Sequence, residues 1–143
     1  MDERVSRTQI DPDSDQRMVS LRRALGITSF GINQMVLQPG QQMRVHDHES
    51  QEEAYLVLEG TLTITIEGDL LELAAGQLAR VPPGVRRQLS NRRRARVVLI
   101  ALGGHGDHES RDAKAYASWD AQTHGTPQDV PLPDDLPPSQ LND

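Results

Sequence analysis

The clearest pattern in the chain is a strict alternation of polar and apolar residues between residues 61 and 66. The run Thr-Leu-Thr-Ile-Thr-Ile places its three aliphatic side chains on one face, as in a strand with one buried side. Other short stretches rich in aliphatic and β-branched residues lie between turn-forming residues. We expect strands over residues 18–23, 27–38, 43–48, 53–58, 61–66, 70–73, 77–81, 86–89 and 96–102.

Turn-forming residues separate these stretches at short intervals. Pro39-Gly40 ends one strand, Glu67-Gly68-Asp69 is typical of a hairpin, and Pro82-Pro83-Gly84 predicts a rigid turn. Because the strands are short and no long helical period is present, the sequence predicts an all-β antiparallel sandwich or barrel.

The chain divides into four stretches by composition. Residues 1–16 form a polar arm and residues 17–104 the barrel, whose core runs from about 18 to 103. Residues 105–125 are expected to form a loop, with room for a short helix over 111–119. Residues 126–143 contain five prolines, several aspartates and no basic residue, so we expect an extended tail, free or laid over a neighbouring surface.

Candidate metal ligands follow the turn at Gly40. His46 and His48 are two positions apart and share one face of an extended strand. Glu53 can join them from the start of the next strand, and its parity with Tyr55 and Val57 favours it over Glu52. Two imidazoles and a carboxylate at one point suit a divalent first-row metal, with Fe, Zn, Ni and Mn as candidates.

With its flanking glycines, this segment resembles the first motif of the cupin superfamily. Its anchors are Gly40, His46, His48, Glu53 and Gly60. The second motif matches at every anchor except one, because an arginine replaces the expected histidine. Its anchors here are Gly76, Pro82, Gly84, Arg87 and Asn91.

The resemblance implies a double-stranded β-helix, or jelly-roll barrel, with the three ligands inside. It also implies dioxygenase-like or isomerase-like chemistry if the protein is an enzyme, which the fold alone does not decide. Similar cupins are commonly homodimers, and we expect a homodimer in which the N-terminal arm is exchanged.

Arg87 has several interpretations. Arginine stays protonated and is not an ordinary metal ligand, so a metal can keep three protein ligands and more open positions. Alternatively Arg87 pairs with Glu53 and the site is metal-free or weak, since a cation repels a divalent ion and attracts a carboxylate. It can also point into the cavity as an anion clamp for a ligand, or turn outward together with Arg86.

Two further groups of residues are weaker candidates. The hydroxyl of Tyr55 can reach a ligand in the cavity, or the ring can simply line the core. His105 and His108 can supply an extra ligand over the barrel mouth, or belong to a polar loop.

The composition of the chain argues against several classes of function and location. The net charge of −6 and the aromatic content of 3% argue against nucleic acid as a partner. The absence of cysteine excludes disulfides and thiolate metal sites. The polar N-terminus is not a secretory signal and no apolar run is long enough to span a membrane, so we expect a cytoplasmic protein.

The sequence therefore favours a metal-binding cupin of unassigned activity that acts on or binds a small organic ligand, anionic in one interpretation. One alternative is a metal-free binding module in which Arg87 clamps an anionic small molecule. Another is an interaction scaffold with a vestigial site, for which the tail is the only support.

Overall fold

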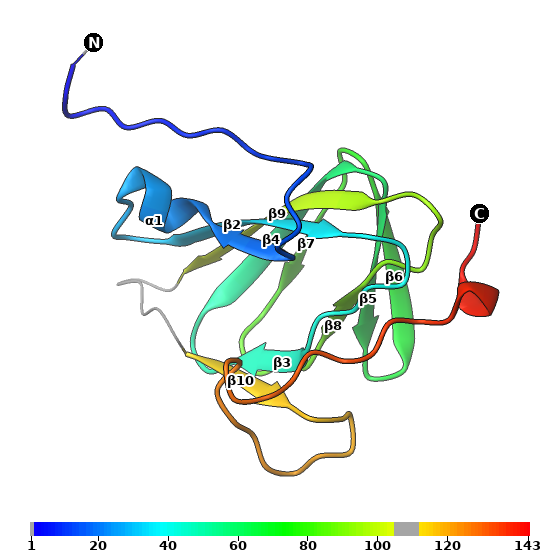
Figure 1. Cartoon of the computed structure of the whole chain (residues 1–143). Coiled ribbons are helices and arrows are strands. Elements are labelled where there is room, and N and C mark those ends of the chain that lie inside the picture. The colour runs from blue at the N-terminus through cyan, green and yellow to red at the C-terminus, as the bar shows by residue number, and fades with distance from the viewer. Residues whose placement is uncertain (1, 105–111) are drawn as a thin grey trace.

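The computed structural model describes residues 2–104 and 112–143, and these residues form a barrel-like sandwich of short antiparallel strands (Figure 1). His105 and His108 lie outside the described residues. The five-stranded sheet has the order β1-β2-β9-β4-β7 and a three-stranded sheet has the order β6-β5-β8. A third sheet pairs β3 with β10.

The elements are numbered in chain order. They are β1 (Met18–Ser20), α1 (Leu21–Leu25), β2 (Gly31–Leu37), β3 (Val45–His48), β4 (Glu52–Glu59), β5 (Thr61–Ile66), β6 (Asp69–Ala74), β7 (Leu78–Val81), β8 (Gln88–Ser90), β9 (Val97–Gly104), β10 (Ala113–Tyr116) and the 3-10 turn η1 (Pro138–Gln140).

The alternation predicted for residues 61–66 is confirmed, and it identifies the face of β5 that packs against the core. Leu62 and Ile64 of β5 are fully buried. They meet the inward side chains of the larger sheet, including Tyr55 and Val57 of β4 and Leu99 of β9. The parity that places Tyr55 and Val57 inside also places Glu53 inside, at the end of the barrel where β4 begins.

Two local expectations are wrong. The stretch 105–125 was expected to be a loop with room for a short helix over 111–119, but in its described part Ala113–Tyr116 forms the strand β10. Its residues hydrogen-bond with the edge of β3, in the register Ala113↔His48 and Tyr116↔Val45, and this pairing overrides a weak local helix preference. The strand expected over 18–23 ends at Ser20, whose side chain caps the short helix α1 by accepting from the amide of Arg23.

The C-terminal tail is laid over the barrel. The Leu136 amide donates to the carbonyl of Gly40 at 2.8 Å, and the Asn142 amide donates to the carbonyl of Arg92 at 2.7 Å. Figure 1 shows the tail passing beneath β3 and β8 towards β5 and β6. These contacts explain how a segment with so few apolar residues becomes ordered.

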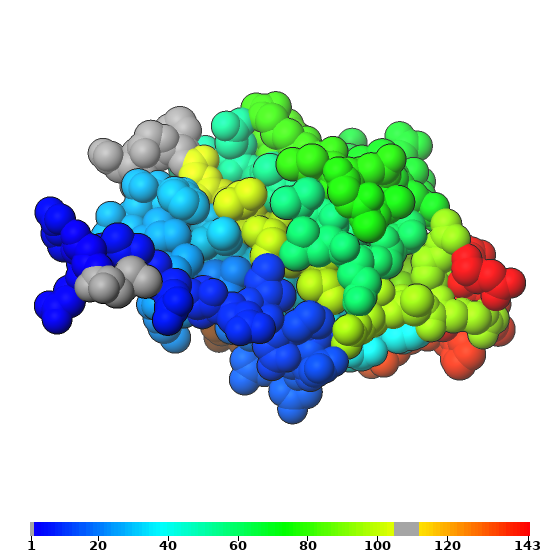
Figure 2. All heavy atoms as spheres, turned by 90° about the horizontal axis from the view of Figure 1, so that it is seen from above, coloured from blue at the N-terminus to red at the C-terminus, as the bar shows by residue number. Residues whose placement is uncertain are grey.

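The N-terminal arm runs along the outer face of the five-stranded sheet before it extends away from the barrel (Figures 1 and 2). The backbone of Asp11 exchanges two hydrogen bonds with the buried side-chain amide of Gln34, at 2.8 and 2.9 Å. Among the described residues, no helix is long and apolar enough to cross a membrane.

Candidate metal centre

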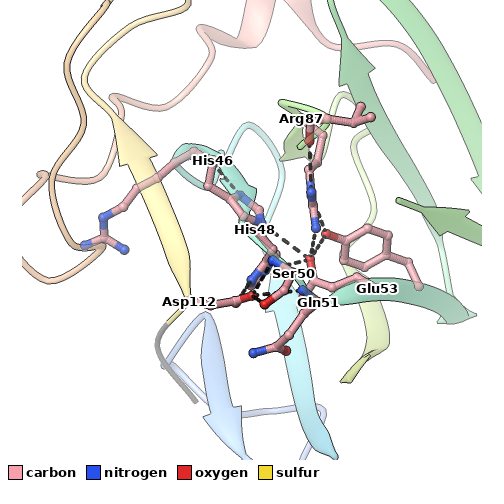
Figure 3. Close-up of polar contacts among 10 residues, drawn as sticks. His46, His48, Ser50, Gln51, Glu53, Arg87 and Asp112 are labelled. Atoms are coloured by element: carbon pink, nitrogen blue, oxygen red, sulfur yellow. Dashed lines mark hydrogen bonds and ion pairs between the residues drawn. The ribbon is translucent and has the colours of Figure 1, made fainter. Parts of the chain in front are cut away.

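The three predicted ligands meet at one end of the barrel interior. One ligand atom from each of His46, His48 and Glu53 can be chosen so that all three lie within 4.8 Å of one another. His46 and His48 come from β3, and Glu53 comes from the next strand after a short turn (Figure 3). The predicted convergence of two imidazoles and a carboxylate is therefore present.

The contacts of the two imidazoles determine which nitrogens face the site. The Nδ1 atom of His46 lies 3.1 Å from the carbonyl oxygen of Arg44, and Nδ1 of His48 lies 2.6 Å from a carboxylate oxygen of Asp112. Both partners only accept hydrogen bonds, so both Nδ1 atoms carry the proton. The Nε2 atoms face Glu53, which is also an acceptor, so a proton on Nε2 can bridge to it, whereas a neutral ring offers its Nε2 lone pair to an ion.

One carboxylate oxygen of Glu53 contacts both imidazoles, the Tyr55 hydroxyl and the Arg87 guanidinium. Its Oε1 atom lies 3.1 Å from Nε2 of His48 and 3.5 Å from Nε2 of His46. The same oxygen accepts hydrogen bonds from the Tyr55 hydroxyl, at 2.5 Å, and from the Arg87 guanidinium. Burial alone would raise the pKa of Glu53, but hydrogen bonds and charge interactions from the two histidines hold it well below its ordinary value.

Arg87 lies inside the protein, with its side chain fully buried. Its Nη2 donates to Glu53, its Nε donates to the hydroxyl of Tyr55 at 3.1 Å, and its Nη1 donates to the carbonyl of Val85 at 2.9 Å. All three nitrogens are thus engaged within the protein. This geometry corresponds to the pairing with Glu53 that was one of the interpretations of the sequence.

The backbone of Arg87 is held as firmly as its side chain. Arg87 and His46 exchange amide-to-carbonyl hydrogen bonds of 2.9 and 3.0 Å, which link the start of β8 to the ligand strand. This link holds Arg87 beside the candidate ligands, at the sequence position where the resemblance implies a histidine. Arg86, by contrast, turns away and stacks over the ring of Tyr116, with its central carbon 3.5 Å from the ring centroid.

Tyr55 combines the two roles considered for it. Its ring is buried in the core cluster and its hydroxyl joins Glu53 to Arg87. Burial and the neighbouring Glu53 carboxylate raise its pKa well above the ordinary value, so the phenol keeps its proton at neutral pH.

Asp112 is a polar residue of the site that the sequence analysis missed. It stands just before β10, and 64 residues separate it from the histidine it contacts. No motif includes it, and an aspartate in a polar loop carries no signal of its own. Only the pairing of β10 with β3 brings it beside His48.

Comparisons with known proteins identify the family of this chain. Residues 33–103 match the Cupin domain family. The chain is 30% identical over 125 residues to the polyketide synthase CurC of Streptomyces cyaneus, covering 76% of this chain and 81% of the relative. This protein belongs to the cupin superfamily.

Solved structures show the same fold. A cupin protein from Bacteroides fragilis is 25% identical, with a TM-score of 0.64 over 77% of this chain and 89% of its own. A sugar phosphate isomerase of the cupin superfamily from Silicibacter pomeroyi is 22% identical, with a TM-score of 0.62 over 87% of this chain and 82% of its own. At that identity the second likeness concerns the fold alone.

Proposed function

We propose that this protein binds a divalent first-row metal ion through His46, His48 and Glu53. The observation that carries the proposal is the direction of the two imidazoles. Both Nδ1 atoms face acceptors, so both Nε2 atoms point at the carboxylate of Glu53. Without an ion, protons and the Arg87 guanidinium satisfy this carboxylate; a divalent ion would take the place of the Nε2 protons, and the set of ligand types fits Fe, Zn, Ni or Mn.

The surrounding contacts also fit a metal centre. Histidine ligands usually donate their second ring nitrogen to a carbonyl or a carboxylate, as both do here. Arg87 works in the opposite direction, because its charge lies against the carboxylate that would bind the ion. We therefore expect weaker metal binding than a site with a fourth neutral ligand would show.

A small organic ligand is the second part of the proposal. A metal ion held by three protein atoms has open positions and supplies Lewis-acid chemistry to a carbonyl or enol oxygen. The curated relative is named as a polyketide synthase, which supports an oxygen-rich intermediate of polyketide assembly as the ligand class. Isomerase-like and dioxygenase-like reactions both remain within this proposal.

The metal-free binding module is the alternative with a specific observation in its favour. The Arg87–Glu53 pair already neutralises the buried carboxylate without an ion. In this alternative, the guanidinium would have to exchange one of its present partners for the ligand, because it has no exposed surface.

Elemental analysis of tag-free protein tests the proposal. We expect close to one metal ion per chain after incubation with Fe, Zn, Ni or Mn, and a loss of that ion in His46→Ala. His124→Ala is the matched control, because His124 packs on Tyr116 away from the ligands. Absence of metal from the wild type under all four conditions would support the metal-free alternative instead.

We also propose that two copies associate through the outer face of the five-stranded sheet. The arm contacts Gln34 of β2 on this face, whereas β4 and β7 pair with each other on the far side of β9, where Leu56 lies opposite Leu78. Figure 2 views this face from above. Leu78 is 62% exposed and Leu58, at the end of β4, is 43% exposed. An apolar sheet face with an edge strand gains from being covered by a second copy.

A further inference from the structure

The two carboxylate oxygens of Asp112 contact two different parts of the site. Oδ1 lies 2.6 Å from Nδ1 of His48. Oδ2 accepts from the backbone amides of Ser50 and Gln51, at 3.0 and 2.9 Å, and from the Ser50 hydroxyl at 3.4 Å. Figure 3 shows this carboxylate between the imidazole and the turn that follows it.

These two sets of contacts affect two different candidate ligands, His48 and Glu53. The first fixes the ring of His48, and the second fixes residues 49–51, the connection between the strand of His48 and the strand of Glu53. The side chain of Asp112 is 5% exposed, so water competes weakly for these contacts. Burial would raise its pKa, but His48 and the two amides lower it below the ordinary value, and the group stays ionised.

We propose that Asp112 is a positioning residue of the metal centre. It holds the proton of His48 on Nδ1, so that Nε2 is free to bind the ion, and it sets the turn that carries the chain to Glu53. This inference rests on the proposed metal binding. It extends the site beyond the two sequence motifs, to a residue that follows the last strand of the barrel.

The chemistry of the contacts explains why an amide cannot replace the carboxylate. In Asp112→Asn, the side-chain oxygen can accept from His48 only if the NH₂ group faces the amides of Ser50 and Gln51, donor against donor. In the other orientation the NH₂ group faces Nδ1 and favours the tautomer with its proton on Nε2. Either arrangement disturbs the metal site, whereas the side chain keeps its shape.

The test compares Asp112→Asn with Asp47→Asn, using Co²⁺ and Zn²⁺ as probes. Asp47 is the matched control, because it is buried on the same strand and accepts from the hydroxyl of Tyr116 of β10 at 3.1 Å. It therefore contributes to the same β3–β10 pairing without contacting either imidazole in the described structure. Affinity is measured by competition with a chelator, and geometry by the visible absorption spectrum of bound Co²⁺.

We expect Asp112→Asn to bind both ions 10- to 100-fold more weakly and to alter the Co²⁺ spectrum. Asp47→Asn should keep an affinity within about threefold and an unchanged spectrum, as expected for a change outside the ligand contacts. Unchanged binding and spectrum in Asp112→Asn, or equal effects in both variants, would overturn the inference.

A measurement on the wild type keeps the test decisive if Asp112→Asn does not fold. Long-range ¹H–¹⁵N spectra of the Zn²⁺-loaded protein should place the His48 proton on Nδ1, and a proton on Nε2 would overturn the inference alone. A wild type that binds neither ion would instead overturn the proposed metal binding and this inference with it.

Discussion

Arg87 places a permanent positive charge beside the three residues of the proposed metal site. The guanidinium is fully buried and the Glu53 side chain is only 13% exposed, and the two groups form an ion pair. Removing one member of such a pair leaves a charge in a medium that solvates it poorly, which typically costs about 3–5 kcal/mol. The same removal takes away a cation that repels a divalent ion. Arg87 therefore supports the metal-free fold and opposes metal binding.

These opposite effects are tested by Arg87→Met, which keeps the length of the side chain and removes its charge. We expect the free energy of unfolding of the metal-free protein to fall by about 3 kcal/mol or more at neutral pH. Metal affinity should rise by at least tenfold. Denaturant unfolding of chelator-treated protein measures the first change, and calorimetric titration with Zn²⁺ measures the second.

Arg80→Met serves as the control for that experiment. Arg80 also pairs with a glutamate of β4, Glu52, at 2.5 Å, but both side chains are more than half exposed. Surface pairs of this kind contribute little, so neither stability nor metal affinity should change appreciably. If Arg87→Met binds metal no better than the wild type, the repulsion attributed to Arg87 is not significant.

The cluster of candidate metal ligands could be predicted at the level of single residues, and the contact of Asp112 with it could not. His46, His48 and Glu53 lie within eight residues, and strand parity is enough to place them on one face. Whether Arg87 pointed inward was left open, because parity does not determine which of two adjacent arginines enters the core. Asp112 reaches the site only through a long-range strand pairing that its local sequence does not indicate.

At the scale of elements, the connection between β4 and β5 depends on Gly60. Its φ of +79° lies in the left-handed region, and a Cβ atom there would lie 2.2 Å from the carbonyl oxygen of Arg96. Gly68, in the hairpin between β5 and β6, has a similar φ of +89°, but open space surrounds its missing Cβ. The two glycines share the same backbone requirement and differ only in the room available.

Alanine substitutions separate these two requirements. Gly68→Ala should lower the free energy of unfolding by about 1–2 kcal/mol, the usual cost of a left-handed L-residue. Gly60→Ala adds a collision with backbone that cannot rotate away, so its total cost should reach about 3 kcal/mol or more. Thermal or denaturant unfolding of both variants measures the difference, and equal losses would contradict the steric argument.

The pattern of elements in the barrel could be predicted better than the elements around it. Alternating positions identified β5, and turn residues separated the remaining strands, because these signals are local. The segment at 113–116 was expected to lie in a loop with room for a short helix, and it forms a strand because it pairs with the edge of β3. Ser20 ended β1 earlier than expected by capping a helical turn.

At the scale of the whole molecule, the outer face of the five-stranded sheet is covered unevenly. The arm lies along one side of this face, while Leu78 on the edge strand β7 remains exposed. Burying such leucines between two copies would contribute roughly 25 cal/mol for each Å² of apolar surface removed from water. The proposed homodimer would cover these leucines.

Leu78→Glu tests this arrangement, because a charge in an apolar interface is costly to bury. We expect the wild type to be a dimer at micromolar concentration and the variant to be a monomer with an unchanged fold, as measured by light scattering after size exclusion. Leu70→Glu is the control, since Leu70 is 55% exposed on β6 of the other sheet. A monomeric wild type, or equal dissociation of both variants, would contradict the proposed face.

The pairing of β3 with β10 has a consequence for the order of events during synthesis. A ribosome delivers the chain from the N-terminus, so every strand through β9 leaves the exit tunnel before β10 does. The strand that carries His46 and His48 therefore keeps an unpaired edge until β10 has been synthesised. The strands of the two larger sheets can pair before that. The interior can be packed in the nascent chain, but its histidine strand is covered only when the last strand arrives.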